Sequence, residues 1–166
     1  MRIGEVLADQ LKRTREWTLM LVADLTGDEW TFQSSAGGQH ALWLCGHMTT
    51  AQEYLIFQVC LTDPKLDASF RDHFPIGTAI KSKAEYSWPA PAEVLAKMAE
   101  IQELTENAVR PMEDALLDEP AFGRDGSKHP HFDTKLSAVG HAVRHEAFHA
   151  GQIASLRKAM GKNFLR

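Results

Sequence analysis

The sequence H-E-A-F-H at positions 145–149 combines residue types and a spacing that suit metal binding. On a helix, residues four positions apart differ by roughly 40° around the axis and about 6 Å along it. The imidazoles of His145 and His149 can therefore reach one divalent metal ion together. In zinc metalloproteases the same pattern carries a glutamate that acts as general base, so Glu146 is a candidate catalytic residue. Its expected position is the rim of this face, where it either orients a bound water molecule or is simply solvated.

The rest of the C-terminal segment argues against a protease. Zinc metalloproteases take their third ligand further along the chain, but positions 150–166 contain no His, Cys, Asp or Glu. Gln152 and Ser155 stand where the extended H-x-x-G-x-x-H pattern needs glycine and histidine. The third ligand must therefore come from upstream.

His47 is the best candidate for that third ligand. We predict it in the middle of a helix on an apolar face, flanked by Trp43 and Tyr54. An imidazole without a partner in a core costs about 1–3 kcal/mol, so this side chain needs a hydrogen bond or a metal. We predict a divalent metal site formed by His47, His145 and His149, with one position open to water or substrate. Because only neutral imidazole binds metal, binding is expected to weaken below about pH 6.

The other histidines are weaker candidates. His141 shares the face of His145, but it lies roughly 12 Å along the axis from His149, too far for bonds of about 2 Å to one ion. We interpret it as a neighbour of the site. His40 is expected at a helix start. The remaining three fall in loops and are expected to be solvated, although any of them could reach the site: His73, His129 and His131.

Four segments must position these residues. Their apolar residues recur every three or four positions, and no segment alternates convincingly as a strand does. Four long helices without strands predict an all-α four-helix bundle, and 166 residues suit one domain over 1–166. The connection at 62–90 is longer than antiparallel neighbours need, which allows it to cross the bundle. The helices are expected at about 3–25, 40–61, 91–112 and 134–160.

Composition limits the partners that the chain can bind. The formal net charge is −4 with scattered Lys and Arg, which argues against nucleic acid, since phosphate binding needs a concentrated basic face. The chain has no run of 18 apolar residues and no signal-peptide pattern, so we expect a cytoplasmic protein without a membrane partner. Cys45 and Cys60 are expected on one helix roughly 22 Å apart, too far for a disulfide within the chain.

Two stretches resemble the DinB-like family of metalloenzymes. They are L-W-L-C-G-H-M-T-T-A-Q-E-Y at 42–54 and H-E-A-F-H-A-G-Q-I at 145–153, and the family pattern has one His in the second helix and H-x-x-x-H before G-Q in the last. The resemblance implies an up-down-down-up four-helix bundle, a nickel or zinc ion on the three histidines, and a homodimer. The resemblance also implies that S-transferases for low-molecular-weight thiols, such as bacillithiol or mycothiol, and a thiol-dependent isomerase are relatives of this chain.

Three functions follow as hypotheses. The first is a metal-dependent enzyme acting on a small thiol or its conjugate, because a metal ion lowers the pKa of a bound thiol. The second is metal-dependent hydrolysis through a bound water, and the third is a non-catalytic, metal-stabilised dimeric bundle with a stress-related binding role. A fourth protein ligand, such as His73 or His131, would close the open metal position and favour the third hypothesis. We also expect part of the segment 62–90, which carries Arg71, Phe74 and Lys81, to cover the metal pocket and contact a small-molecule substrate.

Overall fold

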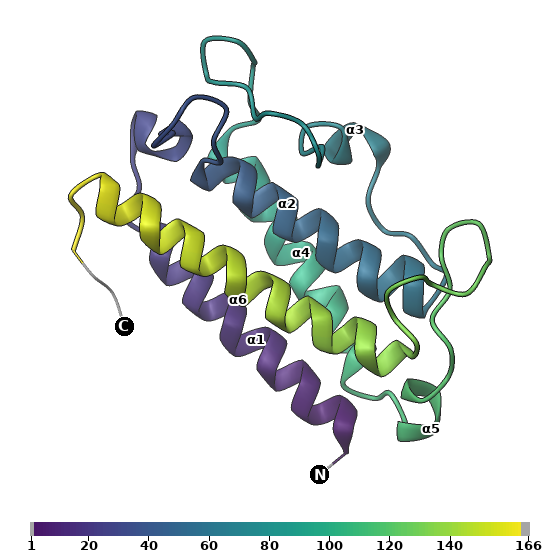
Figure 1. The fold of residues 1–166 in the computed structure, drawn as a ribbon. Coiled ribbons are helices and arrows are strands. Elements are labelled where there is room, and N and C mark those ends of the chain that lie inside the picture. The colour runs from purple at the N-terminus through teal and green to yellow at the C-terminus, as the bar shows by residue number, and fades with distance from the viewer. Residues whose placement is uncertain (1, 164–166) are drawn as a thin grey trace.

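The computed structural model describes residues 2–163 and contains the four expected long helices (Figure 1). Their boundaries lie within a few residues of those expected from the apolar periodicity, and no strand is present in the described part of the chain. The second helix is α-helical at first and then continues as a π-helix, η2. The elements are α1 (Ile3–Val22), α2 (Ala41–Glu53), η2 (Tyr54–Cys60), α4 (Pro91–Val109) and α6 (Lys135–Ala159).

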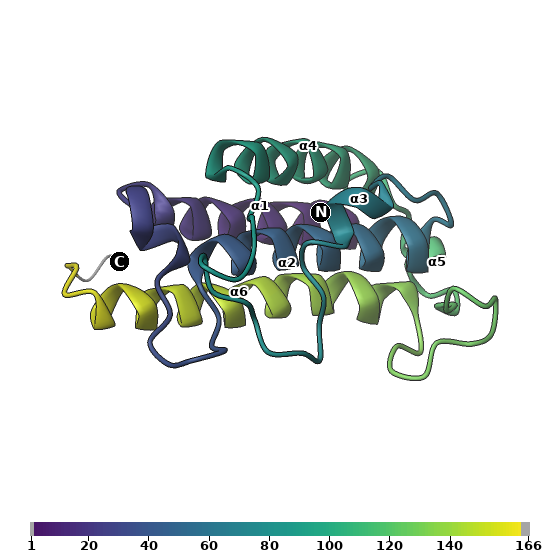
Figure 2. The same cartoon turned by 90° about the horizontal axis from the view of Figure 1, so that it is seen from above.

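The long connection between the second and third helices is explained by their direction. Both α2 and α4 run the same way along the bundle, whereas α1 and α6 run the opposite way (Figures 1 and 2). The chain leaving η2 must therefore travel back along the whole bundle before α4 can begin. The segment 62–90 does this, which confirms the expected crossing and the up-down-down-up topology.

Local residue chemistry sets the helix ends. His40 Nδ1 accepts a hydrogen bond from the Trp43 backbone N–H at 3.1 Å, which confirms His40 as the residue that starts α2. At the start of α6, the Thr134 hydroxyl accepts from the Ser137 backbone N–H at 3.2 Å. Gly161 follows the end of α6 with φ of +74°, a conformation that glycine adopts without strain. The helix α4 ends at Val109, three residues before the expected end, because Pro111 has no backbone N–H to continue the helix.

The sequence interpretation missed three short helices and the π-helix. Gly27–Thr31 (η1), Ala68–Arg71 (α3) and Asp114–Leu117 (α5) form single turns inside segments that were expected to be plain connections. Each is too short to show a repeating apolar pattern, which is why periodicity did not reveal it. Of the helices in residues 2–163, none is both long enough and apolar enough to cross a membrane.

The apolar core is divided into two clusters along the bundle. One includes Leu44, Met98 and Ile153, and the other includes Leu11 and Ile56. Between them lies a layer of buried polar side chains, each from a different long helix. These are Arg15 from α1, Gln52 from α2, Gln102 from α4 and Glu146 from α6.

Gly46, beside His47 in α2, is required by a close contact with the segment 62–90. A Cβ at this position would overlap the ring of Phe74, which is itself 3% exposed. Alanine normally stabilises a helix interior relative to glycine by roughly 0.5–1 kcal/mol. We expect the opposite for Gly46→Ala, a loss of about 1–3 kcal/mol in the free energy of unfolding, because Phe74 must move out of a packed core. Urea unfolding followed by circular dichroism measures this.

Gly151→Ala is the matched control, because nothing lies within 4 Å of a Cβ added at Gly151 in α6. That variant should be more stable than the wild type by roughly 0.5–1 kcal/mol. If Gly46→Ala stabilises the protein as much as Gly151→Ala does, Phe74 does not hold the segment 62–90 against α2.

Candidate metal centre

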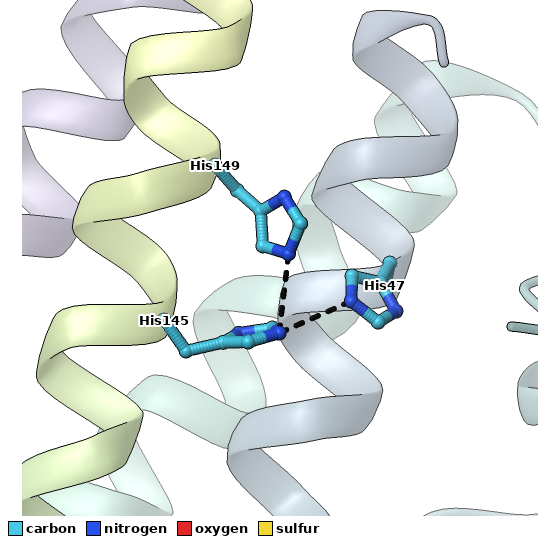
Figure 3. A group of neighbouring side chains, drawn as sticks. All are labelled: His47, His145 and His149. Atoms are coloured by element: carbon cyan, nitrogen blue, oxygen red, sulfur yellow. Dashed lines mark hydrogen bonds between the residues drawn. The ribbon is translucent and has the colours of Figure 1, made fainter. Parts of the chain in front are cut away.

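Three imidazole rings from two facing helices converge inside the bundle. Helix α2 supplies His47, and α6 supplies His145 and His149 one turn apart (Figure 3). His145 Nε2 lies 3.1 Å from His47 Nε2 and 3.1 Å from His149 Nε2. His47 and His149 are 9% and 6% exposed. The structure thus brings together all three residues that the sequence predicted as ligands.

Hydrogen bonds alone satisfy this arrangement poorly. Three Nε2 atoms face one common point, and each neutral ring carries a single N–H, so the His145 Nε2 atom cannot make two separate good bonds. A divalent ion satisfies all three lone pairs at once. Bonds of about 2.0–2.1 Å in a tetrahedral arrangement place ligand nitrogens roughly 3.4 Å apart. Two of the separations here are 3.1 Å, and all three ligand atoms lie within 4.8 Å of one another. The residues present therefore fit a metal ion.

The surroundings of His149 fix the protonation of its ring in the form that binds metal. Its Nδ1 atom lies 2.5 Å from Gln152 Oε1, and the amide oxygen accepts a hydrogen bond, so Nδ1 carries the proton. The Nε2 atom is then left with its lone pair facing the other two histidines. The sequence suggested Gln152 only as a pocket-lining residue, whereas the structure shows it orienting a ligand ring.

Burial keeps the three rings neutral. It lowers the pKa of His47 to about 4 and that of His145 to about 3, and neighbouring imidazoles add to both shifts. Burial also lowers the pKa of His149. The ring of Trp43 lies flat against that of His47, with centroids 4.6 Å apart and planes 8° apart. Neutral, desolvated imidazoles are the form that coordinates a divalent ion.

Glu146 does not lie at a solvated rim, and that part of the sequence interpretation is wrong. The side chain is 4% exposed and pairs with Arg15 of α1. Its two carboxylate oxygens accept from Arg15 Nε at 2.6 Å and Arg15 Nη2 at 2.9 Å. Arg15 also donates to the Met98 carbonyl at 2.8 Å and to Gln52 Oε1 at 2.7 Å. The carboxylate is thus committed to a buried network that joins all four long helices.

The other histidines lie outside the cluster. His141 has its ring centroid 5.8 Å from that of His145, which agrees with its interpretation as a neighbour. His73 Nδ1 is paired with the Tyr86 hydroxyl at 2.7 Å, and His131 is exposed. In residues 2–163, His47, His145 and His149 form the group of His, Cys, Asp and Glu side chains that could hold one ion.

The two cysteines take no part in this site. Both are buried free thiols, as expected, and burial raises the pKa of each to about 12. Protonated thiols of this kind are poor metal ligands and poor nucleophiles.

The segment 62–90 packs beside the metal centre. A cavity of about 80 Å³ lies between it and the ring of Trp43, which stacks on His47. His73 and Lys81 line this cavity, whereas Arg71 donates to the Leu66 carbonyl within the segment. The segment therefore lies beside the part of α2 that carries His47.

Comparison with solved structures shows the same architecture in proteins of distant sequence. A conserved protein from Enterococcus faecalis matches with a TM-score of 0.71 and 16% identity, covering 98% of this chain and 99% of that one. YfiT from Bacillus subtilis, described as a probable metal-dependent hydrolase with an unusual four-helix bundle topology, matches with a TM-score of 0.69 and 16% identity. That match covers 96% of this chain and 89% of YfiT.

The family comparison agrees with the fold and with the two motifs. No curated protein matched the sequence. The model of the DinB superfamily matches residues 10–153, a span that includes all three clustered histidines. The chain therefore belongs to the DinB superfamily.

Proposed function

We propose that the protein is a divalent-metal-dependent enzyme that transfers a low-molecular-weight thiol to a small electrophile. The observation that supports it is the convergence of His47, His145 and His149 on one point with no fourth ligand from the described residues. Three neutral ligands leave an open position and leave the ion its full charge, which favours an anionic partner. Zinc or nickel is the ion that we propose, since imidazole suits both.

The chemistry can be divided between the ion and the protein. A bound divalent ion lowers the pKa of a thiol and so supplies a thiolate near neutral pH. His47, His145 and His149 would hold the ion. Gln152 orients the ring of His149, and Trp43 covers one face of His47. In the reaction, the substrate sulfur forms a bond to an electrophilic carbon. The leaving group departs with its bonding electrons, and the thiol proton passes to solvent.

The position of Glu146 favours a thiol over water as the nucleophile. Hydrolysis by H-E-x-x-H enzymes uses the glutamate as general base, which must reach the bound water. Here Arg15 donates to both carboxylate oxygens in the buried network, so the carboxylate is not free to take a proton from a bound water. A thiol of ordinary pKa near 8.5 needs far less help to ionise than water does, so it requires no base from the protein.

Metal-dependent hydrolysis is the second candidate, and the description of YfiT is the observation that favours it. A water molecule on a zinc ion can reach a pKa near 7 without any general base. A homodimer with a structural metal and a binding role is the third candidate, and the dimer stays a prediction.

Cobalt substitution tests the proposal directly. We expect a small thiol to add a sulfur-to-cobalt charge-transfer band to the absorption spectrum of the cobalt-loaded protein. The zinc- or nickel-loaded protein should accelerate conjugation of that thiol to an electrophile, and His149→Ala should do neither. If several thiols give neither a spectral change nor a rate above background, thiol transfer is wrong. Release of product from ester or amide substrates by the same protein would then place hydrolysis first.

A further inference from the structure

A second group of polar and aromatic side chains surrounds Tyr54, the first residue of η2. His129, from the loop before α6, is 9% exposed, and burial lowers its pKa, which favours the neutral ring. The backbone N–H of His131 donates to His129 Nδ1 at 3.1 Å. A neutral imidazole that accepts at Nδ1 carries its proton on Nε2.

This assignment determines the direction of the next hydrogen bond. His129 Nε2 lies 3.2 Å from the Tyr54 hydroxyl oxygen, so the imidazole donates and the hydroxyl accepts. The hydroxyl proton of Tyr54 is then left pointing away from His129. Within residues 2–163 no side chain or carbonyl accepts it. Tyr54 thus presents an oriented hydrogen-bond donor.

Arg124 provides further donors beside the same ring. Its guanidinium carbon lies 5.0 Å from the Tyr54 ring centroid, and its Nε donates to Gln58 Oε1 at 2.7 Å. These two contacts hold the side chain in place, although it lies on the surface. Its terminal nitrogens form no ion pair in the described part of the chain. The nearest acidic residue in sequence, Asp125, accepts instead from the backbone N–H and hydroxyl of Ser127.

The group lies next to the metal centre along the same face. Tyr54 follows His47 by seven residues, which corresponds to roughly 10 Å along the helix axis with little rotation. A row of aromatic and histidine rings runs from one group to the other. Phe132 stacks on His129 with centroids 4.5 Å apart and lies 5.0 Å from His141, which in turn lies 5.8 Å from His145.

We propose that the Tyr54 hydroxyl and the Arg124 guanidinium bind a carboxylate on a small ligand whose other end reaches the metal centre. A planar guanidinium suits a carboxylate geometrically, and a hydroxyl donor adds a charge-assisted hydrogen bond. The contacts of Tyr54 and Arg124 support the carboxylate site. That the ligand also reaches the metal rests on the proposed function. The substrate class is therefore a small thiol that also carries a carboxylate.

The first experiment tests the carboxylate site without any metal. The chain has only two tyrosines, so ring-¹³C-tyrosine labelling gives two sets of NMR signals, assigned with Tyr86→Phe. We expect propionate to shift the Tyr54 signals with saturation and to leave those of Tyr86, which is paired with His73, unchanged. Arg124→Gln should remove the shift, and propylammonium, a donor of the same size, should cause none. Equal or unsaturable shifts of both tyrosines would overturn the site.

The second experiment tests the link to the metal centre. Cobalt-loaded protein is titrated with 6-mercaptohexanoate and with its neutral counterpart 6-mercapto-1-hexanol. We expect the carboxylate thiol to bind roughly tenfold more tightly, and Arg124→Gln or Tyr54→Phe to remove most of this preference. Arg13→Gln, at an exposed position on α1, should keep it. Equal affinity of the wild type for both thiols would overturn the link. If neither thiol binds cobalt, thiol transfer fails, while the propionate result decides the carboxylate site independently.

Discussion

His149→Ala should lower the affinity for zinc or nickel by more than about 100-fold. Loss of a residue that merely orients a ligand already costs roughly 10–100-fold, and His149 supplies one of three converging nitrogens. Removal of the ring leaves two ligands, one on each helix, with no side chain in residues 2–163 positioned to replace it. Isothermal titration calorimetry with the metal-free protein measures the change. The same loss is expected for His47→Ala and His145→Ala.

His141→Ala is the matched control, because His141 shares the α6 face and lies one turn from His145 but outside the cluster. It should retain wild-type affinity within a fewfold. If His141→Ala empties the site while His47→Ala leaves it full, the third ligand is misassigned.

The pH dependence of binding should also differ from that of exposed histidines. Burial lowers the pKa of His47 to about 4 and of His145 to about 3 in the folded protein, so protons compete with the metal only at lower pH. For ordinary imidazoles, metal binding is expected to weaken below about pH 6. In this site the weakening should therefore begin at a more acidic pH. Metal release at pH 6 or above would contradict the buried geometry.

Arg15→Met should lower the free energy of unfolding by about 3–5 kcal/mol. Arg15 and Glu146 are each 4% exposed or less, and removal of one partner leaves a buried charge without compensation. Gln52 and the Met98 carbonyl lose donors as well. Urea unfolding of the metal-free protein measures this without a contribution from metal binding.

Two variants separate this prediction from a general sensitivity to mutation. Arg110→Met breaks an exposed ion pair with Asp9 and should cost less than about 1 kcal/mol. The double variant Arg15→Met/Glu146→Leu removes both charges and should recover much of the lost stability.

A Glu146→Gln variant that keeps full stability but loses activity would contradict our structural assignment and return Glu146 to the role of general base.

The sequence alone determined the four helices and their boundaries. Apolar periodicity is a local signal, because it repeats within one or two turns of the chain, and the capping residues Thr134 and Gly161 at the two ends of α6 act equally locally. The pairing of His145 with His149 was equally local, since helix geometry places residues four apart on one face. His47 was predicted from a weaker argument, the cost of an unpaired imidazole on an apolar face, and the structure places it beside the other two.

The tertiary structure decided which groups each polar side chain meets. Glu146 was interpreted from its angle to His145, but its partner Arg15 lies 131 residues away, and no periodicity within α6 predicts it. The tautomer of His129 depends in the same way on a backbone N–H in its own loop and on a hydroxyl 75 residues earlier. A helical repeat fixes the direction of a side chain around its own axis. Which side chain of another helix occupies that direction depends on how the helices pack against one another.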